Sequence, residues 1–153
     1  MKIEYLKGNL LDAESGVIAH GCNARGVMGS GVAKYVREKY PGAYEKYNLR
    51  CKLYTDPKVL MGDVIWYEVP EKEGTLYIAN AITQLDFGAD GRRYVSYEAV
   101  DKAFYTINKA MSDNETLHIP MIGAGLGGGD WDVISSIIEA NVYNARDIKC
   151  WVL

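Results

Sequence analysis

The feature that most constrains the fold is a strand-like segment that passes through a glycine-rich turn into a helix. Residues 17–22 form a continuous apolar run, which is typical of a strand buried on both faces. Gly26, Gly29 and Gly31 follow, and residues 31–40 repeat apolar side chains at helical spacing. Such a turn brings backbone N–H groups and the positive end of a helix dipole to one point, which favours an anionic ligand.

A second turn of the same type follows the strand-like segment 116–121. Five of the seven residues from 123 to 129 are glycine. Ordering so flexible a run costs conformational entropy, which indicates that the backbone itself wraps a ligand. The alternative for either turn alone is that its glycines merely permit a tight connection, but two such turns in one small chain favour a ligand site. Asp130 then caps a last helix, which ends near Asn141.

Strands and helices alternate along the chain. We expect strands at residues 2–7, 17–22, 63–69, 75–83, 116–121 and 148–153. We expect further helices at residues 31–40, 43–52 and 96–111. Residues 84–94 form a long polar loop, which is typical of a functional lid. The alternation predicts an α/β fold with a mixed sheet covered on both faces, and ligands beyond the carboxyl ends of its strands.

Composition excludes several classes of function. The 153 residues carry a net charge of −3, so nothing over the whole surface favours a polyanion such as DNA. Three cysteines without a CxxC pair and two histidines argue against a disulfide framework and against a metal site. The N-terminus does not resemble a signal peptide, and no apolar run approaches the roughly 20 residues of a membrane helix. We expect one domain over residues 1–153, soluble and cytoplasmic, with no membrane partner, metal or cofactor.

Three kinds of nucleotide site could use the glycine turns. A P-loop needs Gly-Lys-Ser/Thr, which neither turn contains. A dinucleotide fingerprint is formally present as Gly123-x-Gly125-x-x-Gly128, but the next strand, 148–153, has no acid to hold a ribose. The remaining possibility is a diphosphate held between the two turns by backbone N–H groups, with a nucleoside on either side.

That possibility coincides with a family resemblance that covers essentially the whole chain. The matching motifs are Lys7-Gly8-Asn9-Leu10, His20-Gly21-Cys22-Asn23, Gly26-Val27-Met28-Gly29-Ser30-Gly31-Val32-Ala33 and Pro120-Met121-Ile122-Gly123-Ala124-Gly125-Leu126. With these motifs the sequence resembles the macro domain, an ADP-ribose-binding module. The resemblance implies a three-layer α/β/α sandwich with a mixed, mostly parallel central sheet of about six strands. Lys39-Tyr40-Pro41 and the ending Trp151-Val152-Leu153 resemble a compact branch of phosphatases, terminal-ADP-ribose hydrolases and DNA-directed antitoxin domains.

The resemblance implies ADP-ribose or its 1''-phosphate as the ligand, and hydrolysis of the 1''-phosphate monoester as the reaction. Two alternatives remain open. One is a module that binds ADP-ribose without chemistry. The other is a hydrolase that acts on ADP-ribosylated protein or nucleic acid. The sequence carries no indication of the oligomeric state.

The same resemblance implies a set of ligand-binding residues. Asn9 would hydrogen-bond the adenine amino group, Leu10 would lie against adenine, and Asn23 would contact the distal ribose. The alternatives for Asn9 and Asn23 are ordinary turn-forming and loop-forming roles. The residues that would surround the two phosphates and the distal ribose are Gly29, Ser30, Gly31, Val32, Gly123, Ala124, Gly125, Leu126 and Gly127.

His20 and Asp130 are the candidate catalytic residues. The resemblance implies that His20 exchanges a proton during phosphate hydrolysis, whereas a His at the end of an apolar strand is also typical of a satisfied core residue. Asp130 is either a general acid or base beside the flexible glycine run, or only a helix N-cap. Cys22 lies at an apolar strand end, which indicates an inert thiol.

Two positions depart from the hydrolases of the branch. Those enzymes use a Lys after the fourth strand, where this chain has Gln84, which cannot form a Schiff base or carry positive charge. The terminal-ADP-ribose hydrolases also place an Asp where this chain has Gly127. Arg92 or Arg93 could supply the charge of the missing Lys or bind a terminal phosphate, the alternative being solvent-facing arginines.

Overall fold

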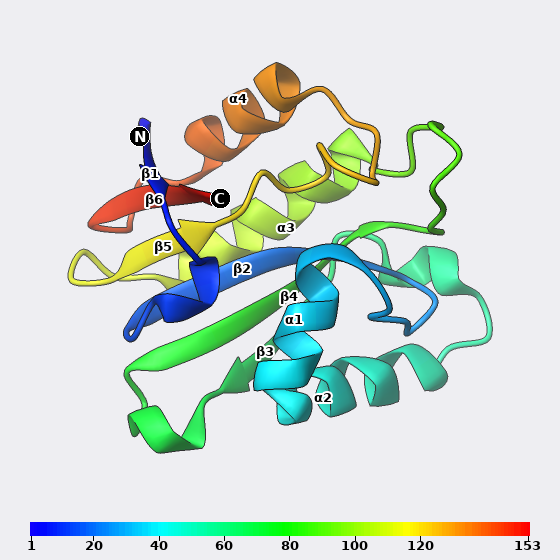
Figure 1. Ribbon diagram of the computed structural model, residues 1–153, viewed down its shortest axis with the longest axis horizontal. Coiled ribbons are helices and arrows are strands. Elements are labelled where there is room, and N and C mark those ends of the chain that lie inside the picture. The colour runs from blue at the N-terminus through cyan, green and yellow to red at the C-terminus, as the bar shows by residue number, and fades with distance from the viewer.

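The computed structural model describes all residues, 1–153, and contains one six-stranded sheet with helices on both faces (Figure 1). The strands are β1 (Ile3–Lys7), β2 (Gly16–Asn23), β3 (Val64–Glu68), β4 (Leu76–Gln84), β5 (Thr116–Ile119) and β6 (Asp147–Val152). The α-helices are α1 (Gly31–Lys39), α2 (Pro41–Lys52), α3 (Tyr97–Ala110) and α4 (Trp131–Asn141). Three short 3-10 helices that the sequence did not predict are η1 (Leu10–Asp12), η2 (Pro57–Leu60) and η3 (Pro70–Lys72).

The strands are arranged in the order β1-β6-β5-β2-β4-β3. Neighbouring strands are parallel except for β3, which runs antiparallel to β4 at one edge. The prediction of a mixed, mostly parallel sheet in a three-layer sandwich is therefore confirmed. Because five strands run in one direction, their carboxyl ends meet at the same edge of the sheet, where ligands bind in folds of this type.

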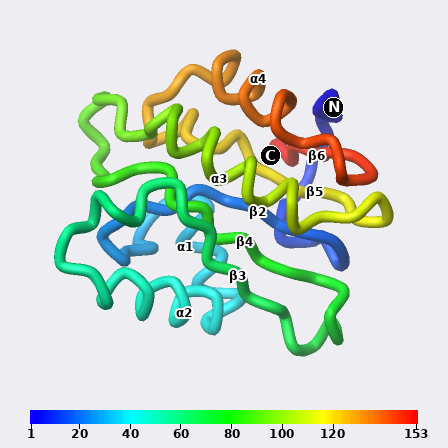
Figure 2. Tube along the Cα trace, turned by 180° about the vertical axis from the view of Figure 1, so that it is seen from behind, coloured from blue at the N-terminus to red at the C-terminus, as the bar shows by residue number.

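Alternate side chains of β2 pack into different cores. Val17 and Ala19 belong to a cluster of 20 buried residues that includes side chains of α3 and α4. Ile18 points to the other face and packs with side chains of α1 and α2 in a cluster of 10. Figure 2 shows the corresponding pairs of helices on opposite sides of the sheet. β2 is thus buried on both faces, as its continuous apolar sequence predicts. None of the helices combines the length and the apolar character that a membrane span requires.

The two glycine turns lie at neighbouring positions on the carboxyl edge. The first connects β2 to α1, and the second connects β5 to α4. Since β2 pairs with β5 in the sheet, the two turns leave adjacent strands and meet above them. This pairing positions the candidate site.

Candidate functional site

A cavity of about 520 Å³ lies between the two glycine turns, and we call it the glycine-turn pocket. Its walls come from the end of β2, the start of α1, the end of β4 with the loop that follows, and the turn after β5. The structure thus brings together segments that are far apart in the sequence. The predicted ligand-binding residues that line the pocket are Asn23, Gly29, Ser30, Gly31, Val32, Gly123, Gly125, Leu126 and Gly127.

The first wall is the uncapped beginning of α1. Ser30 is the N-cap residue of this helix, but its side chain makes no capping hydrogen bond. The backbone N–H groups of Gly31, Val32 and Ala33 donate to no group of the protein. Together they carry the partial positive charge of a helix N-terminus, and all three residues line the pocket.

The second wall is a turn that folds onto itself. The N–H of Gly129 donates to the carbonyl of Gly123 at 2.7 Å, and that of Gly128 donates to Gly125 at 3.1 Å. A side chain at Gly127 would bring its Cβ within 2.7 Å of the Gly123 carbonyl oxygen, so the close packing of this turn requires glycine there. The N–H groups of Gly125, Leu126 and Gly127 remain without an acceptor in the protein. Two sets of free backbone donors therefore border one cavity.

Asn23 lines the pocket but uses its side chain to shape the first turn. Its Oδ1 accepts hydrogen bonds from the N–H groups of Arg25 and Val27, at 3.0 and 3.3 Å, and from the Tyr47 hydroxyl at 2.9 Å. Its Nδ2 donates to the Val27 carbonyl at 2.7 Å. The loop-forming role is thus the one that the contacts show, and Asn23 is 8% exposed.

The lining of the pocket is almost free of ionisable groups. It contains no Lys, Arg, Asp, Glu or His side chain, and Cys22 is its one titratable residue. Burial raises the pKa of the Cys22 thiol well above its ordinary value, and nearby Cys51 acts in the same direction. The thiol therefore stays protonated near neutral pH. No group of three His, Cys, Asp or Glu residues could hold a metal ion.

His20, one of the two predicted catalytic residues, lies in the core of the sheet beside the pocket residue Cys22. His20 is fully buried on the α2 side of the sheet and does not line the pocket. Its Nε2–H donates to Asn80 Oδ1 at 2.6 Å, and Asn80 in turn donates to the Ala43 carbonyl in α2 at 3.2 Å. Burial lowers the pKa of His20 to about 4, against a smaller opposing effect of the Asn80 bond. His20 is thus a neutral core residue that connects β2, β4 and α2.

Asp130 also lies outside the pocket lining, so its catalytic prediction is not supported by the geometry. Asp130 is the N-cap of α4, and its Oδ1 accepts from the N–H of Asp132 at 2.9 Å. Its own N–H donates to the Tyr97 hydroxyl at 3.0 Å. The capping role accounts for this residue.

Three predicted ligand-binding residues do not line the pocket. Asn9 is the N-cap of η1, where its Oδ1 accepts from the Leu11 N–H at 2.9 Å, which is the turn-forming alternative. Leu10 is 6% exposed and packs into the core beneath α1 and α2. Ala124 lies in the second turn but does not border the cavity. The turn η1, which the sequence did not predict, is the reason that Leu10 points inward.

Thr83 is a pocket residue that sequence reasoning missed. The register of β2 and β4 shifts here, since Cys22 pairs with Ile82 and Asn23 pairs with Gln84. Such a bulge redirects a side chain. The Thr83 hydroxyl is buried and has no hydrogen-bond partner, although the residue borders the pocket. Nothing in the sequence signals the bulge.

The loop after β4 supplies a further wall. Gln84 lines the pocket, and its Nε2 donates to the Asp86 carbonyl at 2.7 Å. Phe87 also lines the pocket while 47% exposed, and its being the one phenylalanine of this polar loop is the sequence signal that could have found it. Arg25 pairs with Asp86 at 3.2 Å and so joins this loop to the first glycine turn.

Arg92 and Arg93 do not reach the cavity. Arg92 Nε donates to Asp90 at 2.9 Å, and its guanidinium donates to the Tyr94 hydroxyl at 3.0 Å. Arg93 lies over the ring of Tyr97, 4.5 Å from the centroid. Both arginines therefore organise the loop, and neither replaces the charge of the missing Lys.

Comparison with known proteins decides the family. The family profile described as Macro domain matches residues 19–138, which include both glycine turns. The chain belongs to the macro domain family. A 17.5 kDa protein of Enterobacteria phage T4 without an assigned function is 32% identical to this macro domain, over 91% of the chain and 89% of the phage protein.

Two further relatives of this macro domain have named activities. The ADP-ribose 1''-phosphate phosphatase of Meyerozyma guilliermondii is 26% identical over 93% of this chain and 98% of the enzyme. The DNA ADP-ribosyl glycohydrolase of Mycobacterium tuberculosis is 28% identical over 95% of this chain, which spans 40% of that protein. Among solved structures, a Bacteroides thetaiotaomicron protein of unknown function matches with a TM-score of 0.81 and 26% identity. The match covers 100% of this chain and 99% of the Bacteroides chain.

Proposed function

We propose that this chain, as a single macro domain, binds ADP-ribose in the glycine-turn pocket and hydrolyses the phosphate monoester of ADP-ribose 1''-phosphate. The observation that carries the proposal is that two groups of backbone N–H donors without an acceptor in the protein border the same cavity. One group belongs to residues 31–33 and the other to residues 125–127. A diphosphate between the turns would accept from both sets. The phosphatase relative supports the reaction.

Backbone donors are suited to the diphosphate because they are fixed before binding. The N-terminus of α1 offers three N–H groups and its dipole to one phosphate. The second turn would donate to the other phosphate and to the distal ribose. Val32, Phe87 and Leu126 are more than one-third exposed beside the cavity, so they are available to cover the apolar faces of the ligand.

The reaction would proceed by attack of water on the terminal phosphorus, with cleavage of the bond to the ribose oxygen. N–H groups aimed at the phosphate oxygens would stabilise the charge that develops in the transition state. No side chain of the lining can act as a general base near neutral pH. Since such a base contributes about 10²–10⁴-fold, we expect slow turnover.

The neutral lining also favours a second candidate, a module that binds ADP-ribose without hydrolysing it. The glycohydrolase relatives support a third, the removal of ADP-ribose from a modified macromolecule. The pocket presents Gln84 where the related hydrolases have a nucleophilic Lys, so such a reaction would need another route.

The test is phosphate release from ADP-ribose 1''-phosphate by the wild-type protein, with ADP-ribose as a competitor. The proposal predicts release above the uncatalysed rate and inhibition by ADP-ribose. Tight binding of ADP-ribose without phosphate release would establish the binding module instead. Absence of both binding and release would overturn the assignment of the pocket itself.

A further inference from the structure

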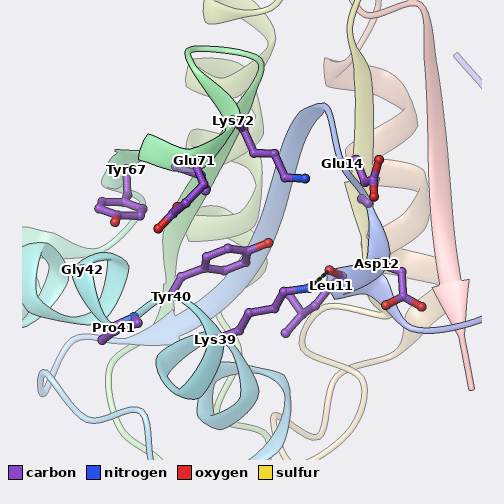
Figure 3. Close-up of a pocket in the computed structure, with 12 residues that line it drawn as sticks. Leu11, Asp12, Glu14, Lys39, Tyr40, Pro41, Gly42, Tyr67, Glu71 and Lys72 are labelled. Atoms are coloured by element: carbon purple, nitrogen blue, oxygen red, sulfur yellow. Dashed lines mark hydrogen bonds between the residues drawn. The ribbon is translucent and has the colours of Figure 1, made fainter.

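A second cavity, of about 530 Å³, lies at the opposite edge of the sheet, where β2 and β4 begin (Figure 3). It is bounded by η1, by η3, by the end of β3 and by the junction of α1 with α2. None of its residues belongs to the glycine-turn pocket. A ligand in this cavity would therefore be independent of the function proposed above.

Tyr40 is the residue that indicates a ligand here. The residue is 8% exposed, its hydroxyl is open to solvent and donates to no group of the protein, and Figure 3 shows this hydroxyl pointing into the cavity. Tyr67 forms a second aromatic wall of the cavity. The carboxylate of Glu71 points toward both rings in Figure 3. Burial and the Glu71 charge raise the pKa of both phenols, which agrees with this placement.

The charges of the cavity favour a cation. Asp12, Glu14 and Glu71 line it, and none of these carboxylates forms an ion pair in the protein. Of the two lining lysines, Lys39 already donates to the Leu11 carbonyl at 2.6 Å. The three carboxylates face two ammonium groups, so the lining carries one net negative charge.

The N-terminus of α2 does not offer an anion site beside them. The ring of Tyr67 lies directly over Gly42, where an added Cβ would be 2.6 Å from the phenol. The ring thus covers the first turn of α2 and blocks the approach of an anion to its N–H groups.

We propose that this cavity binds an organic cation of the guanidinium type, with its charge against Glu71 and its plane between the rings of Tyr40 and Tyr67. A planar guanidinium suits this arrangement, because it forms paired hydrogen bonds with a carboxylate and stacks on aromatic faces. Such a group occurs both in free arginine and in an arginine side chain of a polypeptide. Lys72, whose ammonium points away from Glu71 in Figure 3, could pair with the carboxylate of the free amino acid.

The experiment is a nuclear magnetic resonance titration of the isotope-labelled protein with N-acetyl-arginine amide, and separately with N-acetyl-citrulline amide, its neutral counterpart. The proposal predicts saturable shifts at the Gly42 amide with the arginine compound and none with the citrulline compound. Glu71→Gln should weaken the affinity at least about tenfold, because it removes a charge-assisted bond. Glu73→Gln, on the same segment but outside the cavity, should bind like the wild type.

A parallel titration with free L-arginine distinguishes the two sources. Tighter binding of the amino acid than of the amide, lost in Lys72→Gln, would identify a free amino acid as the ligand class. Tighter binding of the amide would identify an arginine of a polypeptide. Shifts that do not saturate, equal shifts with citrulline, wild-type affinity in Glu71→Gln, or shifts confined to the glycine-turn pocket would overturn the proposal.

Discussion

His20 illustrates how burial decides the role of a residue. The resemblance to phosphatases implied a catalytic imidazole, and the apolar strand around it implied a core residue. Both expectations rest on the same position in β2, and the sequence does not state on which face the side chain lies. The structure bonds it to Asn80 beneath α2, with only Cys22 of the pocket lining in contact with its ring.

The stability of the protein should fall in acid because of His20. Its pKa is about 4 in the folded protein and 6.5 for an ordinary histidine, so between these pH values the unfolded chain holds a proton that the folded chain lacks. The free energy of unfolding therefore decreases as the pH falls through this window, by about 3 kcal/mol at most from this residue. Urea unfolding of the wild type and His20→Gln at pH 7 and pH 4.5 measures the effect.

We expect His20→Gln to lose less stability between these pH values than the wild type. His118→Gln is the matched comparison, because burial also lowers the pKa of His118, although it is less deeply buried. An acid-induced loss in His20→Gln as large as that of the wild type would show that His20 does not carry the effect.

At Thr83 we expect a substitution that keeps stability but weakens binding, because the buried hydroxyl forms no hydrogen bond in the fold. Thr83→Val replaces the buried hydroxyl with a methyl group of similar shape, so the free energy of unfolding should stay the same or rise by about 1 kcal/mol. If the hydroxyl serves the ligand, the affinity for ADP-ribose should fall about 3–10-fold. Thr106→Val, at an exposed position of α3, is the control. A destabilised Thr83→Val with unchanged affinity would contradict this role.

At the scale of elements, periodicity predicts most of the fold. The strands and helices lie within a few residues of their predicted ranges, and the differences have local causes. β5 ends at Ile119 because Pro120 has no N–H to donate to the sheet. α2 begins at Pro41, which suits the first turn of a helix, where a free N–H is not needed. Two of the 3-10 turns begin at local caps, Asn9 and Asp56, whereas no sequence pattern indicates the bulge at Thr83.

Two substitutions of Asp130, the N-cap of α4, distinguish a capping role from a catalytic one. Asp130→Ala should lower the free energy of unfolding by about 1 kcal/mol, because it removes the side-chain bond to the Asp132 N–H. Asp130→Asn retains an equally good capping oxygen and should retain stability, ADP-ribose binding and phosphate release. Thermal unfolding and the release assay measure both variants. Loss of release in a stable Asp130→Asn protein would instead make the carboxylate catalytic.

At the scale of the whole molecule, the site depends on which strands become neighbours. The two glycine turns could be recognised from the sequence, and the rule for parallel sheets placed both at the carboxyl edge. Their meeting in one cavity depends on the pairing of β2 with β5, which the structure shows and the sequence did not predict. Asn9 follows β1, which is separated from β2 by β6 and β5, and its turn does not reach the cavity.

The central claim is that free backbone donors of the two turns hold ADP-ribose, and Gly125 allows the most direct test. A side chain there would meet no protein atom within 4 Å, so Gly125→Val should fold normally while filling the cavity. Ala124→Val, the adjacent position outside the lining, is the matched control.

The decisive measurement is calorimetric titration of ADP-ribose into the wild type and these two variants, with thermal unfolding of each. We predict one site in the wild type and in Ala124→Val, and an affinity at least about tenfold weaker in a fully folded Gly125→Val protein. No binding by the wild type, or wild-type affinity in Gly125→Val, would contradict the account.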